Sequence, residues 1–213
     1  GLAVGGLDVR DAVLRWHDAQ AGQRLALEGL DLTTGAIVPG RPVDLELAFT
    51  VSGEEPAVDG DVRLTTELVL DVAARRYQAR DLELEVTLRG DGLPGAPLGL
   101  SLGAQVRADL GAETVTVDAL ELETLGLRAS GAANAEGILG APSYRANLQV
   151  AEFSPRGLME RLGLPAPETA DPGVLQRASL EARVRGDAGS LQAETLSARL
   201  DDTRLEGSAG IAD

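Results

Sequence analysis

The stretch Val43-Asp-Leu-Glu-Leu-Ala-Phe-Thr-Val51 carries the pattern that decides the fold. Apolar side chains occupy every second position, and polar or small side chains stand between them. Successive side chains of a β-strand point to opposite faces of its sheet. This alternation therefore predicts a half-buried strand with one apolar and one polar face.

The same alternation recurs along most of the chain. It is found in the segments 62–66, 82–88, 98–102, 115–117, 144–150 and 180–184. The intervening positions carry Asp, Glu, Arg and Thr, so one face of the sheet is expected to be wet. A sheet with one wet face favours antiparallel pairing over a parallel sheet covered on both sides.

One long segment changes phase in its middle. Leu25 and Leu27 give way to Leu30 and Leu32 across Gly29. A shift by one residue is typical of a β-bulge, which bends the sheet. The sequence therefore predicts a mainly β protein built on a curved antiparallel sheet, either trough-like or sandwich-like.

A short segment interrupts the strand pattern. Ser154 is a suitable N-cap, Pro155 suits the first helical position, and Gly163 suits the position after the last turn. Three apolar side chains fall on one side of such a helix, and we expect them to dock on the apolar sheet face near one end: Leu158, Met159 and Leu162.

The dipeptide Asp171-Pro172 resembles a second cap that opens a short turn through Arg177. We therefore expect one helical cap at about residues 154–177. The rest of the chain, 1–213, is expected to form a single β-rich segment. Because the chain starts at Gly1 without an initiator Met and stops just after a strand-like run, we expect it to be excised from a longer protein.

The composition disfavours several classes of function. The chain has 34 acidic and 19 basic residues, a net charge of −15, and all its basic residues are Arg. Nucleic acids and anionic membrane surfaces attract basic patches, so neither is an expected direct partner. Only 2% of the residues are aromatic, so the apolar surface is almost entirely Leu, Val and Ala.

Two catalytic motifs occur without the context that they need. Gly99-Leu-Ser-Leu-Gly103 matches a hydrolase nucleophile elbow, but Ser101 lies inside an alternating strand pattern, and His17, the only histidine, precedes it. Gly90–Gly95 matches a dinucleotide fingerprint, but a strand and not a helix follows it. We therefore expect no enzyme activity, no catalytic residues and no cofactor.

Acidic pairs provide weak candidates for metal ligands. They are Glu54 with Glu55, Asp59 with Asp61, and Asp201 with Asp202. A Ca²⁺ site needs six or more converging oxygens, and no EF-hand pattern is present. The chain also lacks Cys and Lys. We therefore expect no metal site.

Three stretches, in an order and spacing that cover nearly the whole chain, resemble the AsmA family of large, inner-membrane-anchored envelope proteins. They are residues 7–32, the run from Phe153-Ser-Pro-Arg-Gly-Leu-Met159 to Leu175, and Leu200-Asp-Asp-Thr-Arg-Leu-Glu-Gly207. The last is the most specific. Within it, the Asp and Thr side chains are expected to bond the backbone of their own tight hairpin.

The resemblance implies a periplasmic β-rich scaffold, anchored to the inner membrane by a segment that this chain lacks. It also implies a role in outer-membrane biogenesis, since relatives of the family are viewed as bridges that carry phospholipid between membranes. Phospholipid acyl chains and other envelope proteins are the partners that the resemblance suggests. The family supplies no catalytic residues.

The sequence predicts which residues would face such a lipid. Nine apolar side chains are expected to share one interior, while Asp44, Glu46, Glu83, Glu85 and Ser101 point to water. The nine are Leu45, Leu47, Phe49, Leu82, Leu84, Val86, Leu98, Leu100 and Leu102. Burying one CH₂ group is worth about 0.8 kcal/mol, so a trough lined in this way would stabilise an acyl chain.

Two alternatives stay open from the sequence. The same apolar face could pack against a second sheet or the helical cap as a closed core, since every antiparallel sheet has such a face. In place of phospholipid transport, the domain could act as a scaffold that affects outer-membrane protein assembly through its strand edges or its acidic face.

Overall fold

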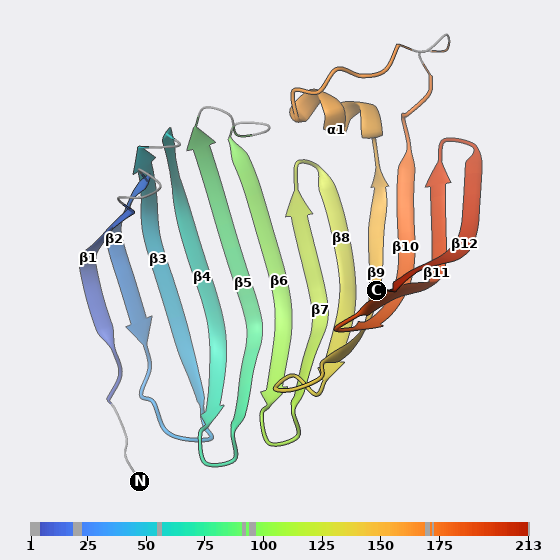
Figure 1. The fold of residues 1–213 in the computed structure, drawn as a ribbon. Coiled ribbons are helices and arrows are strands. Elements are labelled where there is room, and N and C mark those ends of the chain that lie inside the picture. Colours follow the sequence, from blue (N-terminus) through green and yellow to red (C-terminus); the bar gives the residue numbers. More distant parts are fainter. Residues whose placement is uncertain are drawn as a thin grey trace.

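The computed structural model describes residues 5–18, 23–54, 57–90, 93, 97–168, 171 and 173–212. This part of the chain contains twelve β-strands and one α-helix (Figure 1). The strands are β1 (Asp8–Asp18), β2 (Gln23–Thr34), β3 (Pro42–Glu54), β4 (Ala57–Asp71), β5 (Arg76–Gly90), β6 (Leu98–Asp109), β7 (Thr114–Thr124), β8 (Leu127–Glu136), β9 (Ser143–Phe153), β10 (Ala178–Asp187), β11 (Ser190–Leu200) and β12 (Thr203–Ala212). The helix α1 (Pro155–Arg161) lies between β9 and β10.

All twelve strands form one antiparallel sheet in chain order, β1 to β12. The sheet is not closed, so β1 and β12 are its two edge strands. Short connections explain this meander. The β7–β8 turn, for example, has two central residues, Leu125 and Gly126, with φ of 51° and 77°. Such a turn matches the twist of the flanking strands. The expected mainly β, antiparallel fold is confirmed.

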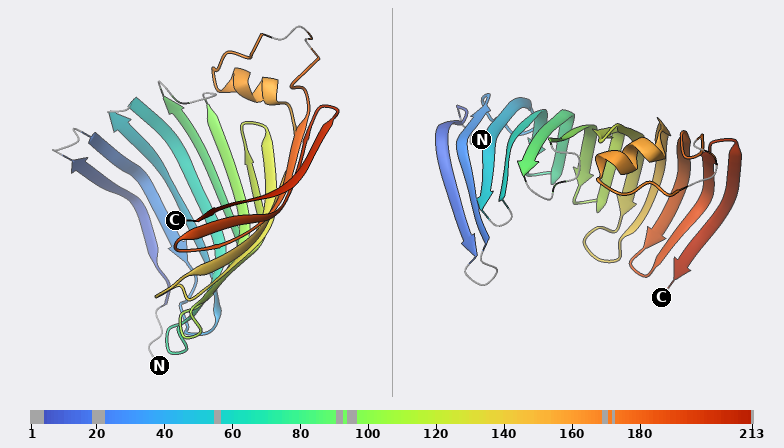
Figure 2. Two further views of the ribbon diagram at one scale, coloured as in Figure 1. Left: turned by 45° about the vertical axis from the view of Figure 1, so that its right-hand side comes forward. Right: turned by 90° about the horizontal axis from the view of Figure 1, so that it is seen from above.

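Bulges curve the sheet. The pairing of β2 shifts between Glu28 and Asp31, where Gly29 has a φ of 57°, so the bulge predicted at Gly29 is confirmed. Similar shifts occur in β5 at Asp81 (φ 46°) and in β7 at Ala119 (φ 49°). Figure 2 shows the sheet twisted and arched, with both ends of the strand series bent to the same side.

The register places one aliphatic side chain from every strand in a single row across the sheet. Residues directly opposite each other in an antiparallel pair lie on the same face. This central row consists of Val9, Leu32, Leu47, Leu64, Leu84, Leu102, Leu122, Ala129, Val150, Leu180, Ala198 and Leu205. One face of the sheet is therefore apolar from edge to edge.

A matching row occupies the opposite face. It is polar or small at every strand: Asp8, Thr33, Glu46, Thr65, Glu83, Gly103, Glu121, Ser130, Gln149, Glu181, Ser197 and Glu206. The wet and dry faces inferred from the alternation are thus continuous over the whole sheet.

The sheet forms a single layer. Among the described side chains, the buried ones are Val43, Ala104 and Thr66, and no large side chain is fully buried. Close contacts between elements join strands that are neighbours in the sheet. The trough-like form of the prediction therefore holds and the sandwich-like form does not. No second layer of the described chain closes the apolar face.

The helical cap is shorter than expected. Ser154 accepts a hydrogen bond from the Gly157 amide (3.1 Å) at the N-terminus, but α1 ends at Arg161. The described residues of the following crossover, 162–177, form no further helix. Asp171 instead accepts a hydrogen bond from the Gly173 amide (2.7 Å) in a turn.

The expected docking of α1 on the sheet face is wrong. The helix lies beyond the ends of β8 and β9 and covers neither face of the sheet (Figures 1 and 2). None of its residues is buried, and Leu158, Met159 and Leu162 are half-buried. The helix begins at Pro155, directly after its N-cap Ser154 and the end of β9 at Phe153.

Candidate functional site: the apolar face of the sheet

The structure brings the nine predicted residues onto one face. Leu47, Leu84 and Leu102 belong to the central row. Phe49, Val86 and Leu100 form part of the adjacent row, bridged by Val62 on β4. The remaining three, Leu45, Leu82 and Leu98, lie on the same face.

Exposure separates the two predicted sets. All nine apolar residues are half-buried, whereas Asp44, Glu46, Glu83, Glu85 and Ser101 are all exposed. The predicted split between the two faces is therefore confirmed. Contact between the nine and lipid stays a prediction.

The sequence reasoning found only part of this face. A second complete row runs from β3 to β12, and it too is aliphatic throughout. Its members are Val43, Leu68, Ala79, Val106, Val117, Ala133, Ala146, Val184, Ala193 and Ala209. The bulges at Asp81 and Ala119 shift the alternation within β5 and β7, so that period two alone does not connect the two rows.

Between its margins, the apolar face carries few groups that form hydrogen bonds. Thr66 is the buried polar residue on this face, and its hydroxyl donates to the Arg80 carbonyl (2.8 Å) beside the β5 bulge. Its hydrogen is therefore engaged within the sheet and is not directed at a ligand. Chemically, such a face can bury hydrocarbon, but it offers no acid, base or nucleophile.

On the opposite face, ion pairs connect neighbouring strands. Examples are Arg63 with Glu85 (3.7 Å) and Arg80 with Glu67 (3.0 Å). These groups are largely exposed, so each pair contributes little to stability. They solubilise this face, and they match the strand register because opposite charges stand directly across from each other.

The acidic residues weighed as metal ligands have other partners. Asp59 and Asp61 lie near Arg89 (3.8 and 3.5 Å), and Glu54 accepts a hydrogen bond from Arg24 (2.8 Å). No group of three or more potential ligands that could hold a metal ion occurs in the described ranges.

The residues of the two enzyme motifs are also placed. Ser101 lies in the middle of β6, opposite Glu85 and Glu123, and not at a strand-to-helix turn. The side chain of His17 and most of the loop 91–96 lie outside the described residues.

The crossover after α1 is fastened to the sheet at two turns. At the first, the Arg161 guanidinium donates to the Leu125 carbonyl (2.7 Å) in the β7–β8 turn. A Cβ on Gly126 would stand 1.7 Å from a guanidinium nitrogen of Arg161. Gly126 is therefore needed for its positive φ, and a side chain there would require the Arg161 guanidinium to move.

At the second turn, the Asp201 carboxylate accepts hydrogen bonds from three backbone amides of the crossover. The donors are Leu175 (2.7 Å), Gln176 (2.9 Å) and Arg177 (3.0 Å). The amide of Arg177, followed by that of Leu175, lowers the pKa of Asp201. The expectation that this side chain bonds its own hairpin is wrong, because the carboxylate caps a loop that lies 24–26 residues earlier.

No helix in the described part of the chain is long and apolar enough to cross a membrane. Comparisons of the chain with protein-family models, with curated proteins and with solved structures found no match, so the resemblance to the AsmA family rests on the sequence stretches alone.

Proposed function

We propose that this domain holds phospholipid acyl chains on its apolar face, as the periplasmic part of an inner-membrane-anchored protein that supports outer-membrane biogenesis. One observation carries the proposal: every one of the twelve strands contributes an aliphatic side chain to one row, and no second layer formed by the described residues covers that row. The periplasmic location, the anchor and the envelope partners rest on the resemblance to the AsmA family.

The extent of the apolar face supports an occupant. Twelve strands at a spacing of about 4.8 Å span roughly 50 Å. A continuous apolar surface of this size on a soluble domain marks an interaction site. Uncovered, it would expose many half-buried Leu and Val side chains to water.

The chemistry of the face favours hydrocarbon over a protein partner. Protein interfaces depend on Trp, Tyr and Arg anchors that fill pockets on the partner. The interior rows contain mainly Leu, Val and Ala, with Phe49, Thr66 and Thr124, and no arginine among the described residues. A smooth aliphatic surface suits an acyl chain, whose 16 carbons carry roughly 10 kcal/mol of hydrophobic free energy.

A second candidate function is an interaction scaffold for outer-membrane protein assembly. The outer edges of β1 and β12 have no strand partner within the described sheet. On β12, Leu205 and Ile211 are 62% and 73% exposed. An edge strand of this kind can accept a strand of another protein.

Binding of a fluorescent phospholipid to the purified domain tests the proposal. Leu84→Asp places a carboxylate in the central row, and Ser101→Asp places the same charge on the polar face of the adjacent strand. We expect Leu84→Asp to weaken lipid binding strongly and Ser101→Asp to leave it unchanged. Equal binding by both variants, or no binding by the unmodified domain, would contradict the proposal.

Two further measurements separate the alternatives. Leu205→Asp changes an exposed member of the central row, so it tests the face even if Leu84→Asp does not fold. Size-exclusion chromatography of lipid-free protein tests whether a second copy covers the face. A stable dimer that binds no lipid would indicate a protein interface.

A further inference from the structure

The amphipathic aromatic residues of the chain lie at the margins of the apolar face. Tyr77 and Tyr144 belong to one row, the last before the turns at one end of the strands. This lower row comprises Leu70, Tyr77, Ala108, Val115, Ala135, Tyr144, Gly186, Leu191 and Ile211. Both tyrosines stand one residue inside the start of their strands, β5 and β9.

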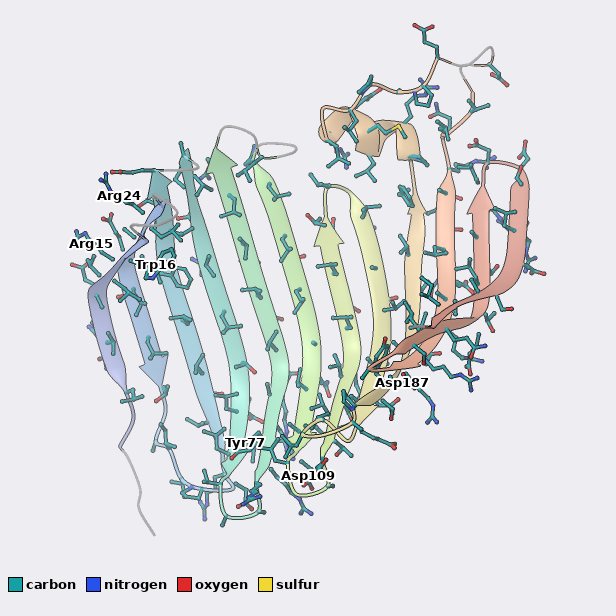
Figure 3. The ribbon with its side chains drawn as sticks, in the orientation of Figure 1. Arg15, Trp16, Arg24, Tyr77, Asp109 and Asp187 are labelled. Atoms are coloured by element: carbon teal, nitrogen blue, oxygen red, sulfur yellow. The ribbon has the colours of Figure 1, made fainter. Side chains whose placement is uncertain are left out.

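Trp16 occupies the opposite margin. It lies across from Leu25, which pairs with Gly53 in the outermost row at the other end of the strands. Figure 3 shows the Trp16 ring over the neighbouring strands, whereas Arg15 points outward past the edge. The rows between the two margins hold no Tyr or Trp.

The side chain of Tyr144 packs over a glycine of the neighbouring strand. A Cβ on Gly186 would stand 2.5 Å from the Tyr144 phenol oxygen and 2.6 Å from the adjacent ring carbon. The ring therefore lies across Gly186 on β10, where any larger residue would displace it. Tyr144 remains 36% exposed.

Both ends of the strands carry charged and apolar groups: Val72 (67% exposed) and Leu139 (65%) lie in turns beyond the lower row, and Arg24 pairs with Glu54 at the other end. Arg75 lies in the β4–β5 turn, and Arg76, which follows it, pairs with Asp109 (2.8 Å) on the polar face of the sheet. Figure 3 shows Tyr77 and Asp109 together at this end. Beyond the other end lie α1 and the crossover, which presents Leu164 with 54% exposure.

Tyrosine and tryptophan favour the boundary where hydrocarbon meets water, because each has an apolar ring and a polar group. Resting on the lipid-holding function proposed above, we propose that the lower row is the headgroup boundary. Acyl chains extend from it along the strands, and phosphate-bearing headgroups lie along this row, beside Tyr77 with Arg75 in the adjoining turn and beside Tyr144 four strands away. Phenol and guanidinium groups both donate hydrogen bonds to phosphate oxygens.

Fluorescence quenching by spin-labelled phospholipids tests this orientation. Three variants carry a single Trp each in a Trp16→Phe background: Tyr77→Trp, Tyr144→Trp and, as the interior control, Phe49→Trp. Each is mixed with phosphatidylcholine that bears a nitroxide either on the headgroup or near the end of one acyl chain. Circular dichroism confirms that each variant is folded.

We expect the headgroup label to quench the Tyr77→Trp and Tyr144→Trp variants several-fold more than the chain-end label does, with the opposite ratio for Phe49→Trp. If all three variants show the same ratio, lipid binds without this orientation, and the inference fails while the lipid-holding function stands. If neither label quenches any variant, both fail.

Discussion

At the scale of single residues, the structure depends on positions where backbone geometry matters more than burial. Only a few of the described side chains are buried, so a typical large-to-small core substitution has few targets here. Gly126 and Asp201 are the clearest such positions. Each determines how the crossover after α1 attaches to a turn of the sheet.

Gly126→Ala should destabilise the domain by about 1 kcal/mol or more, because Gly126 has a φ of 77°, which an L-residue adopts only with strain. Gly99→Ala is the matched control, since a Cβ there meets nothing within 4 Å. Urea denaturation checks both variants. Equal losses of stability would show that the positive φ of Gly126 is unimportant.

Asp201 should make the attachment of the crossover sensitive to acid. Its pKa is lowered in the folded state, so its contribution is complete above the unfolded carboxyl pKa of about 4 and disappears as the pH falls through the folded pKa. Hydrogen exchange of the amides of 175–177 as a function of pH checks this.

Asp201→Asn should reduce the protection of these amides at neutral pH and remove most of its acid dependence. Asp202→Asn is the control, because the Asp202 side chain is 99% exposed and lies 3.5 Å from Arg177. Unchanged protection in Asp201→Asn would mean that the carboxylate does not hold the crossover.

At the scale of elements, most strands were predictable, but alternation did not identify β8 or β11, and the irregularities of the strands were only partly predictable. Alternation identifies strands because the side-chain period of a strand is two. Gly29 also revealed its bulge, since glycine tolerates positive φ. Asp81 and Ala119 adopt the same conformation, but an Asp or Ala in an alternating segment gives no comparable signal.

The helix α1 shows a second limit of prediction from the sequence: its start was predictable, but its position was not. Its N-cap and its proline depend on local contacts, and both were predictable. Its position depends on where β9 ends and on bonds to turns far along the chain, from Arg161 to Leu125 and from the crossover to Asp201. Side-chain spacing within the helix contains no information about these distant partners.

Ala119→Gly should stabilise the domain by up to about 1 kcal/mol. Ala119 is exposed and has a φ of 49°. An L-residue in this region is strained by roughly 1–2 kcal/mol, and glycine would relieve that strain. Glycine also gives the unfolded chain more conformational freedom, which offsets part of the gain. Ala133→Gly in β8 should instead destabilise it. Chemical denaturation of both variants is the check, and a loss in both would contradict the assignment of the bulge.

At the scale of the whole molecule, the domain is a single curved layer with one polar and one apolar face. A sheet normally buries its apolar face against another layer. Here the described chain provides none, and the continuity of the rows from β1 to β12 became visible only from the strand register. A ligand that covers the face should therefore also stabilise the fold, because binding to the folded state alone raises its stability.

Lipid analysis of the purified domain tests the central claim most directly. The domain is isolated without detergent, extracted with organic solvent, and its lipids are quantified by mass spectrometry beside those of the Leu84→Asp and Ser101→Asp variants. We predict phospholipid bound in a reproducible molar ratio to the unmodified domain and to Ser101→Asp, and strongly reduced in Leu84→Asp. A domain that is folded and free of lipid, or equal lipid content in all three proteins, would contradict the assignment of the apolar face as a lipid-holding surface.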